Sequence, residues 1–201
     1  MFNAPPAVVW TCGLLVAIQV IRLVLPAETE LYLLEYGALI PELLDNGYPY
    51  WWTLLTYAFL HGDFPHVLIN SAFILAIGSG VARLTNGGMF LILFMLSALG
   101  GGIAIYAFAP PGSVTVGASG ALTGLIGAAA VLLYRYRDVD PRARMMGAMV
   151  AIVVVMNLIL AFTGGSGISW QGHLGGLIAG AIYGYAIMGR QPPPRGPRLV
   201  R

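Results

Sequence analysis

The sequence has few charged residues. Only 9% of its 201 residues are Asp, Glu, Lys or Arg, while 58% have hydrophobic side chains and the mean hydropathy is +0.82. Water-soluble domains are about one-quarter charged and about half apolar. The shortage of charge excludes an ordinary soluble domain. It predicts an all-α integral membrane protein, in which ~20 residues per span leave room for about five to seven helices.

Cysteine and lysine are also scarce. The one cysteine, Cys12, has no partner for an intramolecular disulfide and no Cys or His neighbours at ligand spacing, so we expect no metal site. The ten basic residues are all arginine and stand against eight acidic residues, for a net charge of +2. A surface that follows phosphates needs a concentrated basic stripe, so nucleic-acid binding is excluded.

Six apolar runs are long enough to be candidate spans. They cover residues 7–25, 64–82, 89–109, 114–134, 145–162 and 170–188. Between the first two, residues 26–63 are acidic and rich in Leu, Tyr and Trp, which predicts short amphipathic segments at the membrane interface. We therefore expect a six-helix membrane domain over residues 1–190 and a disordered Arg- and Pro-rich cytoplasmic tail over 191–201.

The N-terminus and the charges indicate how the chain is oriented. The N-terminus lacks the basic region and cleavage site of a secretory signal, so we expect the first run to remain as a span. Arginines gather in alternate connections, at Arg83, over residues 135–144 and in the tail, and the positive-inside rule places both termini in the cytoplasm. Arg22 is the exception, and we expect its long side chain to reach the interface by snorkelling.

Four polar residues lie near the outer ends of the second, fourth and sixth runs. They are His66, Asn70, Ser119 and His173. His66 and Asn70 are four residues apart and so share one helix face. Each residue also has a simpler explanation, as an interhelical hydrogen bond, a small packing residue or an interfacial side chain. Their common depth favours one shared site.

Glycines surround the serine and the last histidine. Gly117 and Gly120 flank Ser119 and leave room for a substrate backbone and a neighbouring helix. Small residues recur every four positions in the sixth run and form a matching face on the fourth. They are Gly172, Gly176, Gly180 and Gly184, and Gly120, Thr123, Gly124, Gly127 and Ala128. We expect these helices to pack face to face, with His173 within hydrogen-bond reach of Ser119.

A serine beside a neutral histidine is the minimum for acyl transfer, with the histidine as general base. Hydrogen-bond donors for the developing oxyanion would be Asn70, His66 and the backbone N–H groups near Ser119 at the helix start. No membrane-embedded Asp or Glu is available to orient His173. We therefore expect packing alone to hold the imidazole.

At these residues the sequence resembles the rhomboid family of intramembrane serine proteases. The matching pieces are "HGDFPHVLIN" (61–70), "GASG" (117–120) and "GHLGGLIAG" (172–180), which occur in the family's order. The resemblance extends from about residue 51 to 188. It implies a rhomboid-like bundle of six transmembrane helices, with a mobile fifth helix or adjoining loop as the gate.

The resemblance also implies roles for individual residues. Ser119 would be the nucleophile, His173 the general base, Asn70 and His66 the oxyanion donors, and Gly117 would shape the turn before the serine. The implied activity is cleavage of single-pass transmembrane protein substrates near their outer ends, in the lipid bilayer and without metal, nucleotide or other cofactor. The small size is typical of a version from a bacterial or archaeal plasma membrane.

Two positions depart from the family's pattern. Many relatives have a Trp-Arg pair where this chain has Trp52 and Thr53, and an aromatic residue four positions after the nucleophile where this chain has Thr123. These departures leave an alternative open, a catalytically weak or inactive rhomboid-like protein that binds membrane clients. A transporter is disfavoured, because the polar residues gather near one face and not at the midplane.

Three further polar residues need an explanation. Asn157 lies within the fifth run, where we expect a packing hydrogen bond or a contact of the gate. His61 and Asp63 precede the second run. We expect them to organise the first loop or to contribute to the rim of the site.

Overall fold

The computed structural model describes residues 4–134, 141–163 and 168–188. Over these residues the chain is helical, and its one β-contact is an isolated antiparallel bridge between Leu39 and Thr115. The all-α class is therefore confirmed. The predicted tail over 191–201 lies outside the described residues, as does most of the arginine-bearing connection after residue 134.

Each predicted apolar run contains a helix. The first is α1 (Pro6–Leu23), and the second is continuous through α5 (Phe64–Phe73), the π-helical turn η2 (Ile74–Gly78) and α6 (Ser79–Leu84). The others are α7 (Gly87–Phe108), α8 (Ser119–Tyr134), α9 (Pro141–Thr163) and α10 (Trp170–Met188). Among the described residues, three helices are long and apolar enough to cross a bilayer, namely α1, Phe64–Leu84 and α7. The membrane character is thus supported, while the count of six spans stays a prediction.

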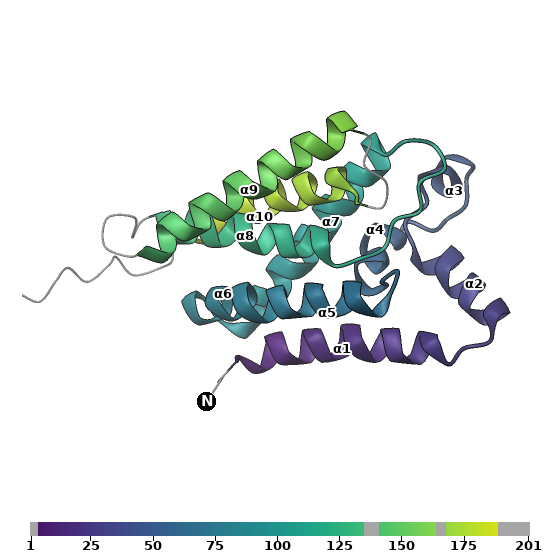
Figure 1. Cartoon of the computed structure of the whole chain (residues 1–201), viewed down its shortest axis with the longest axis horizontal. Helices are drawn as coiled ribbons and strands as arrows, with labels where there is room; N and C mark the ends of the chain where they lie inside the picture. The colour runs from purple at the N-terminus through teal and green to yellow at the C-terminus, as the bar shows by residue number, and fades with distance from the viewer. Residues whose placement is uncertain (1–3, 135–140, 164–167, 189–201) are drawn as a thin grey trace, which may run out of the picture.

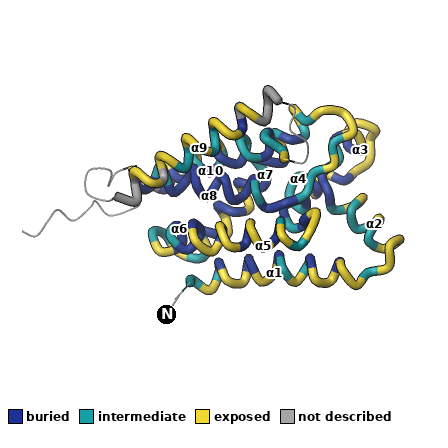
Figure 2. The backbone as a smooth tube through the Cα atoms, viewed as in Figure 1, coloured by how far each residue is buried: buried dark blue, intermediate teal, exposed yellow. Residues whose placement is uncertain are grey.

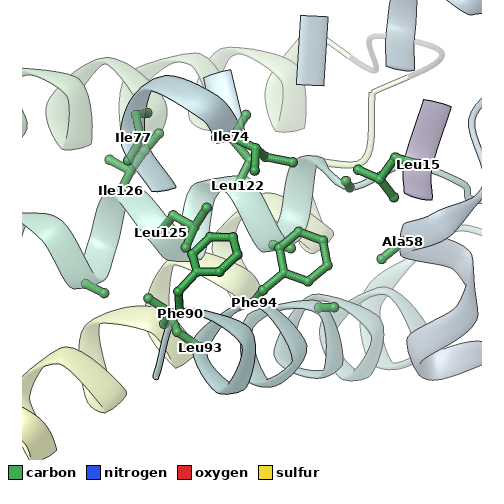
Figure 3. Close-up of a cluster of buried hydrophobic side chains, with 14 of the residues drawn as sticks. Leu15, Ala58, Ile74, Ile77, Phe90, Leu93, Phe94, Leu122, Leu125 and Ile126 are labelled. Atoms are coloured by element: carbon green, nitrogen blue, oxygen red, sulfur yellow. The ribbon is translucent and has the colours of Figure 1, made fainter. Parts of the chain in front are cut away.

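Helix α8 lies at the centre of the bundle (Figure 1), packed most extensively against α10 and α7. It is buried along almost its whole length (Figure 2), whereas α1 shows an exposed outer face. The core forms where aromatic side chains of α7 meet aliphatic side chains of α8 and η2 (Figure 3). Its members include Phe90, Phe94, Leu122, Leu125, Ile126, Ile74 and Ile77. The site residues on α8 and α10 are therefore attached to the most buried part of the molecule.

The small faces of α8 and α10 meet as predicted. A side chain on Gly176 would overlap the backbone carbonyl of Gly120, and one on Gly180 would overlap that of Gly124. A β-carbon added to Gly120 would lie 3.0 Å from the carbonyl oxygen of Gly172. The two backbones are in van der Waals contact, which only glycine permits.

The predicted interfacial segment folds into short helices. They are α2 (Ala27–Gly37), α3 (Pro41–Asp45), α4 (Thr53–Thr56) and the 3-10 turn η1 (Tyr57–Phe59). Aromatic rings join them, with the Tyr36 and Tyr50 centroids 4.9 Å apart and the Trp52 indole donating to the Tyr36 carbonyl at 2.7 Å. Thr53, at the first departure from the family pattern, is buried and donates to the Tyr50 carbonyl at 2.7 Å.

Arg22 is buried against α2, while its expected reach to the membrane interface stays a prediction. Its side chain is 7% exposed and pairs with Glu30 at 2.6 Å. The guanidinium also donates to Gln19 at 3.1 Å and to the backbone carbonyl of His61. Helix α2 begins only four residues after α1 ends, which brings a carboxylate alongside the arginine, and a buried charge needs such a partner.

Candidate active site

A cavity of about 1070 Å³ lies where α5, α8 and α10 begin. His66, Ser119 and His173 all line it, from three different helices. Much of the rest of the wall comes from the loop before α8, over residues 113–117, and from residues 168–172 at the start of α10 and just before it. The structure thus brings three of the four predicted polar residues to one open space.

Ser119 is the first residue of α8. We predicted helix from residue 114, and this boundary is wrong. Residues 114–118 are apolar but not helical, because Thr115 exchanges backbone hydrogen bonds with Leu39 at 3.0 Å and Gly117 donates to the Tyr57 carbonyl at 2.9 Å. The serine therefore lies beside the unpaired N–H groups of a helix start, a favourable place for an anion.

Gly117 fits closely against His66. Its φ is +128°, a conformation that residues with side chains rarely adopt. A β-carbon at this position would lie 2.8 Å from Cε1 and 3.0 Å from Nε2 of His66. The imidazole is therefore packed on the turn that leads into the serine.

Asn70 is buried one turn further along α5, with 4% of its surface exposed. Among the described residues its Nδ2 has no hydrogen-bond partner, although a buried polar group ordinarily has one. The same nitrogen would lie 3.9 Å from a β-carbon on Gly117. Asp63 fixes the start of the helix, because its carboxylate accepts from the His66 backbone N–H at 2.7 Å. A free amide donor is thus held close to the turn before Ser119.

His173 is held by two hydrogen bonds, so the expectation that packing alone orients it is wrong. Its Nδ1 lies 3.2 Å from Oδ1 of Asn157 on α9. Its backbone carbonyl accepts from the Thr123 hydroxyl of α8 at 2.8 Å. We predicted a packing hydrogen bond or a gate contact for Asn157 and noted Thr123 as a departure from the family's pattern. Their contacts with His173 could not be predicted, because neither is local in the chain.

The residues beside Ser119 and His173 are in direct contact. Gly120 follows the serine and Gly172 precedes the histidine, and their backbones touch. Among the described residues, His173 is hydrogen-bonded to Asn157, to Thr123 and, through its backbone N–H, to the Ser169 carbonyl at 3.2 Å, and none of these bonds joins it to Ser119. Catalytic hydrogen bonds often tighten only when substrate binds. The direct contact between serine and histidine stays a prediction.

His61 supports the loop that leads into Ser119, whereas we predicted that it organises the first loop or contributes to the rim of the site. It is fully buried, and its Nε2 accepts from the Ala118 backbone N–H at 3.3 Å. Burial, the neighbouring His66 and Arg22 lower the pKa of His61 from 6.5 to about 4. The ring is therefore neutral near pH 7, with its Nε2 free to accept. Its partner, Ala118, immediately precedes Ser119.

No three His, Cys, Asp or Glu side chains gather as a metal site would require, among the residues that the structure describes. The cavity instead offers the Ser119 hydroxyl and the imidazoles of His66 and His173, and the buried amide of Asn70 lies close to its wall at Gly117. These groups are suited to nucleophilic attack on a carbonyl and to stabilisation of the oxyanion that forms.

The fold and the cavity define an all-helical membrane protein with a polar site at the start of three helices. A family model described as the Rhomboid domain matches residues 48–190, and the chain belongs to this family, whose members are generally intramembrane serine proteases.

Named relatives agree with this assignment. The chain is 32% identical over 155 residues to "Rhomboid protease GluP" of Bacillus subtilis, which covers 77% of this chain and 29% of the relative. It is 36% identical over 156 residues to "Rhomboid-like protease 1" of Toxoplasma gondii, covering 76% of this chain and 52% of the relative. "RHOMBOID-like protein 5" of Arabidopsis thaliana is 29% identical over 156 residues, covering 77% and 49%. The chain thus spans 29% to 52% of the length of these relatives.

Proposed function

We propose that this protein is an intramembrane serine endopeptidase that cleaves single-pass transmembrane proteins near their outer ends. Ser119 is the nucleophile and His173 is the general base. The observation that carries the proposal is the cavity that these two residues line together. Their helices are in direct backbone contact next to them, at Gly120 and Gly172.

The chemistry follows from the groups in the cavity. His173 accepts the proton of the Ser119 hydroxyl as the oxygen attacks the scissile carbonyl, and it then passes the proton to the leaving amine. Water hydrolyses the acyl-enzyme, with His173 as base again. The open cavity of about 1070 Å³ gives this water a route to the serine.

The oxyanion would be stabilised from two sides. One side is the start of α8, where backbone N–H groups near Ser119 have no intrahelical acceptor. The other side is α5, which contributes the unpartnered amide of Asn70 and the imidazole of His66. Donors fixed before the reaction stabilise the developing charge without any cost of reorganisation.

The arginine pattern supports an orientation for this site. With both termini in the cytoplasm, the cavity opens near the outer face of the membrane, and the substrates are proteins of the same bilayer. The proposal places the protein in a bacterial or archaeal plasma membrane. It needs no metal, nucleotide or other cofactor for the steps above.

The test is cleavage of a tagged single-span substrate by purified protein in liposomes, with the cut located by mass spectrometry. The wild type is expected to cut near the outer end of the span, and Ser119→Ala and His173→Ala are expected to abolish cutting. Folded wild type that cuts none of several substrates with weakened helices would contradict the proposal and support the client-binding alternative. Cutting that persists in Ser119→Ala would assign the activity to another group.

A further inference from the structure

Asn157 on α9 contacts the imidazole that the proposed mechanism uses as its base. The residue is 4% exposed and lies in the last two turns of α9, where the neighbouring positions are apolar. Its amide has two partners on opposite sides. Nδ2 donates to the backbone carbonyl of Val153 at 2.7 Å, and Oδ1 lies 3.2 Å from Nδ1 of His173.

These two contacts fix which way round the amide lies. A backbone carbonyl can only accept, so the atom that faces Val153 must be the NH₂ group. The atom that faces His173 is then the amide oxygen, which also can only accept. The imidazole must therefore carry its proton on Nδ1, and its Nε2 keeps a free lone pair.

We propose that Asn157 is a positioning residue that holds His173 in the tautomer needed for a general base. The inference rests on the proposed function, because it assigns Nε2 of His173 as the atom that receives the Ser119 proton. Thr123 holds the backbone of His173 from α8, and Asn157 holds its ring from α9. Two helices thus fix the base without a buried carboxylate.

The proposal explains how the base is oriented where no acid is available. Without the acceptor of Asn157, the Nδ1–H group would be buried and unpaired, and the other tautomer would become competitive. That tautomer places a proton on Nε2 and cannot take one from the serine. The Nε2-protonated tautomer would compete with the Nδ1-protonated one but would not replace it. Turnover should therefore fall without being abolished.

The kinetic test compares two substitutions on α9. Asn157→Leu keeps the side-chain size and removes the acceptor, and we expect kcat to fall about 10- to 100-fold with KM almost unchanged. Val153→Ala removes apolar packing one turn away and leaves the acceptor in place, and we expect kcat close to wild type. An equal or larger loss of kcat in Val153→Ala would show that α9 acts only through packing, and would overturn the proposal.

A spectroscopic test does not depend on activity. The chain has 3 histidines, so ¹⁵N-histidine labelling gives few ring signals, which His61→Gln and His66→Gln assign. We expect His173 near neutral pH to show a protonated Nδ1 and an unprotonated Nε2 in the wild type and in Ser119→Ala, and a mixture of tautomers in Asn157→Leu. A protonated Nε2 in the wild type would overturn the proposal.

The two failures can be told apart. Loss of the proposed function would appear as a wild type that cuts no substrate, whatever tautomer the ring has. Failure of the positioning role would appear as an active wild type whose His173 tautomer and kcat are the same in Asn157→Leu. Asp63 and His66 are titratable groups that line the same cavity as His173. The spectra of all variants are therefore compared at one pH, so that the charges around His173 are the same.

Discussion

The α8–α10 side of the cavity is built from backbone against backbone, whereas the α5 side is built from hydrogen bonds. On the first side, Gly120 and Gly176 bring two helices into contact that no side chain could enter. On the second, Asp63 caps α5 and His61 accepts from the backbone next to the serine. No added side-chain atom fits between α8 and α10 on the glycine side. On the α5 side, the hydrogen bond to the backbone next to the serine depends on the protonation state of His61.

The difference assigns separate tasks to the two sides. Close helix contact fixes where the nucleophile and the base lie relative to each other, since packed backbones have almost no freedom to shift. Hydrogen bonds on the α5 side set the donors for the oxyanion. We therefore expect added atoms between the two glycine faces to cost the most stability, and changes to single hydrogen bonds to have smaller effects.

The largest effect is expected at Gly176. Gly176→Ala would push its methyl group into the Gly120 carbonyl, and the helices must separate, at a cost of about 3 kcal/mol or more. Gly13→Ala is the control, because that position on α1 has nothing within 4 Å. Thermal unfolding in detergent measures both. Equal unfolding midpoints for the two variants would refute the close-packing account.

A substitution at Gly117 tests whether the contact with His66 matters in addition to the positive φ of this residue. Gly117→Ala forces a methyl group to 2.8 Å from Cε1 of His66, and we expect kcat to fall about 10- to 100-fold because the turn before Ser119 shifts. Gly112→Ala is the matched control: its φ is also positive, at +77°, but nothing lies within 4 Å. Both variants carry backbone strain, so comparable losses of kcat would show that contact with His66 is unimportant.

Acid should weaken the α5 side through His61. The pKa of His61 is about 4 in the fold against 6.5 ordinarily, so the unfolded state binds the proton more readily and stability falls as pH decreases. The loss begins below pH 6.5, is about 2 kcal/mol between pH 7 and pH 5, and is complete below pH 4. In His61→Gln the amide oxygen accepts from Ala118 without titrating. The unfolding midpoint of this variant should therefore fall less than that of the wild type as the pH is lowered. Identical pH profiles of the two proteins would show that His61 does not cause the loss of stability in acid.

The smallest effect is expected at Thr123, which links the two helices of the glycine side. Thr123→Val removes the donor to the His173 carbonyl, which costs about 1 kcal/mol and lowers kcat a few-fold. Thr11→Val is the control, since the Thr11 hydroxyl donates to the Ala7 carbonyl within α1 at 2.9 Å. If kcat is as high in Thr123→Val as in Thr11→Val, the hydrogen bond from Thr123 does not help to position His173.

The glycine side could be predicted from the sequence, and much of the α5 side could not. Small residues at every fourth position mark a contact surface in the sequence itself, so the approach of Gly120 and Gly172 was foreseeable. The start of α8 was not, because residues 114–118 are largely apolar and hold a non-helical conformation through backbone hydrogen bonds to the distant Leu39 and Tyr57.

Long-range polar contacts were equally hidden. Asn157 and His173 each stood out as polar residues in apolar runs, but their contact crosses two helices and 16 residues of sequence. Arg22 broke the charge pattern, and only the fold shows that Glu30 neutralises it. A sequence shows which buried polar groups need partners, while the packing of helices decides which partners they find.

The most direct measurement identifies the serine that reacts with a fluorophosphonate. In this reaction an activated serine oxygen attacks the phosphorus and displaces fluoride. Purified protein in detergent is labelled and digested, and the modified peptide is sequenced by mass spectrometry. The account predicts an adduct on Ser119 alone, and none in His173→Ala. An adduct on another serine, or labelling of Ser119 that is unaffected by His173→Ala, would contradict the claim that these two residues act together.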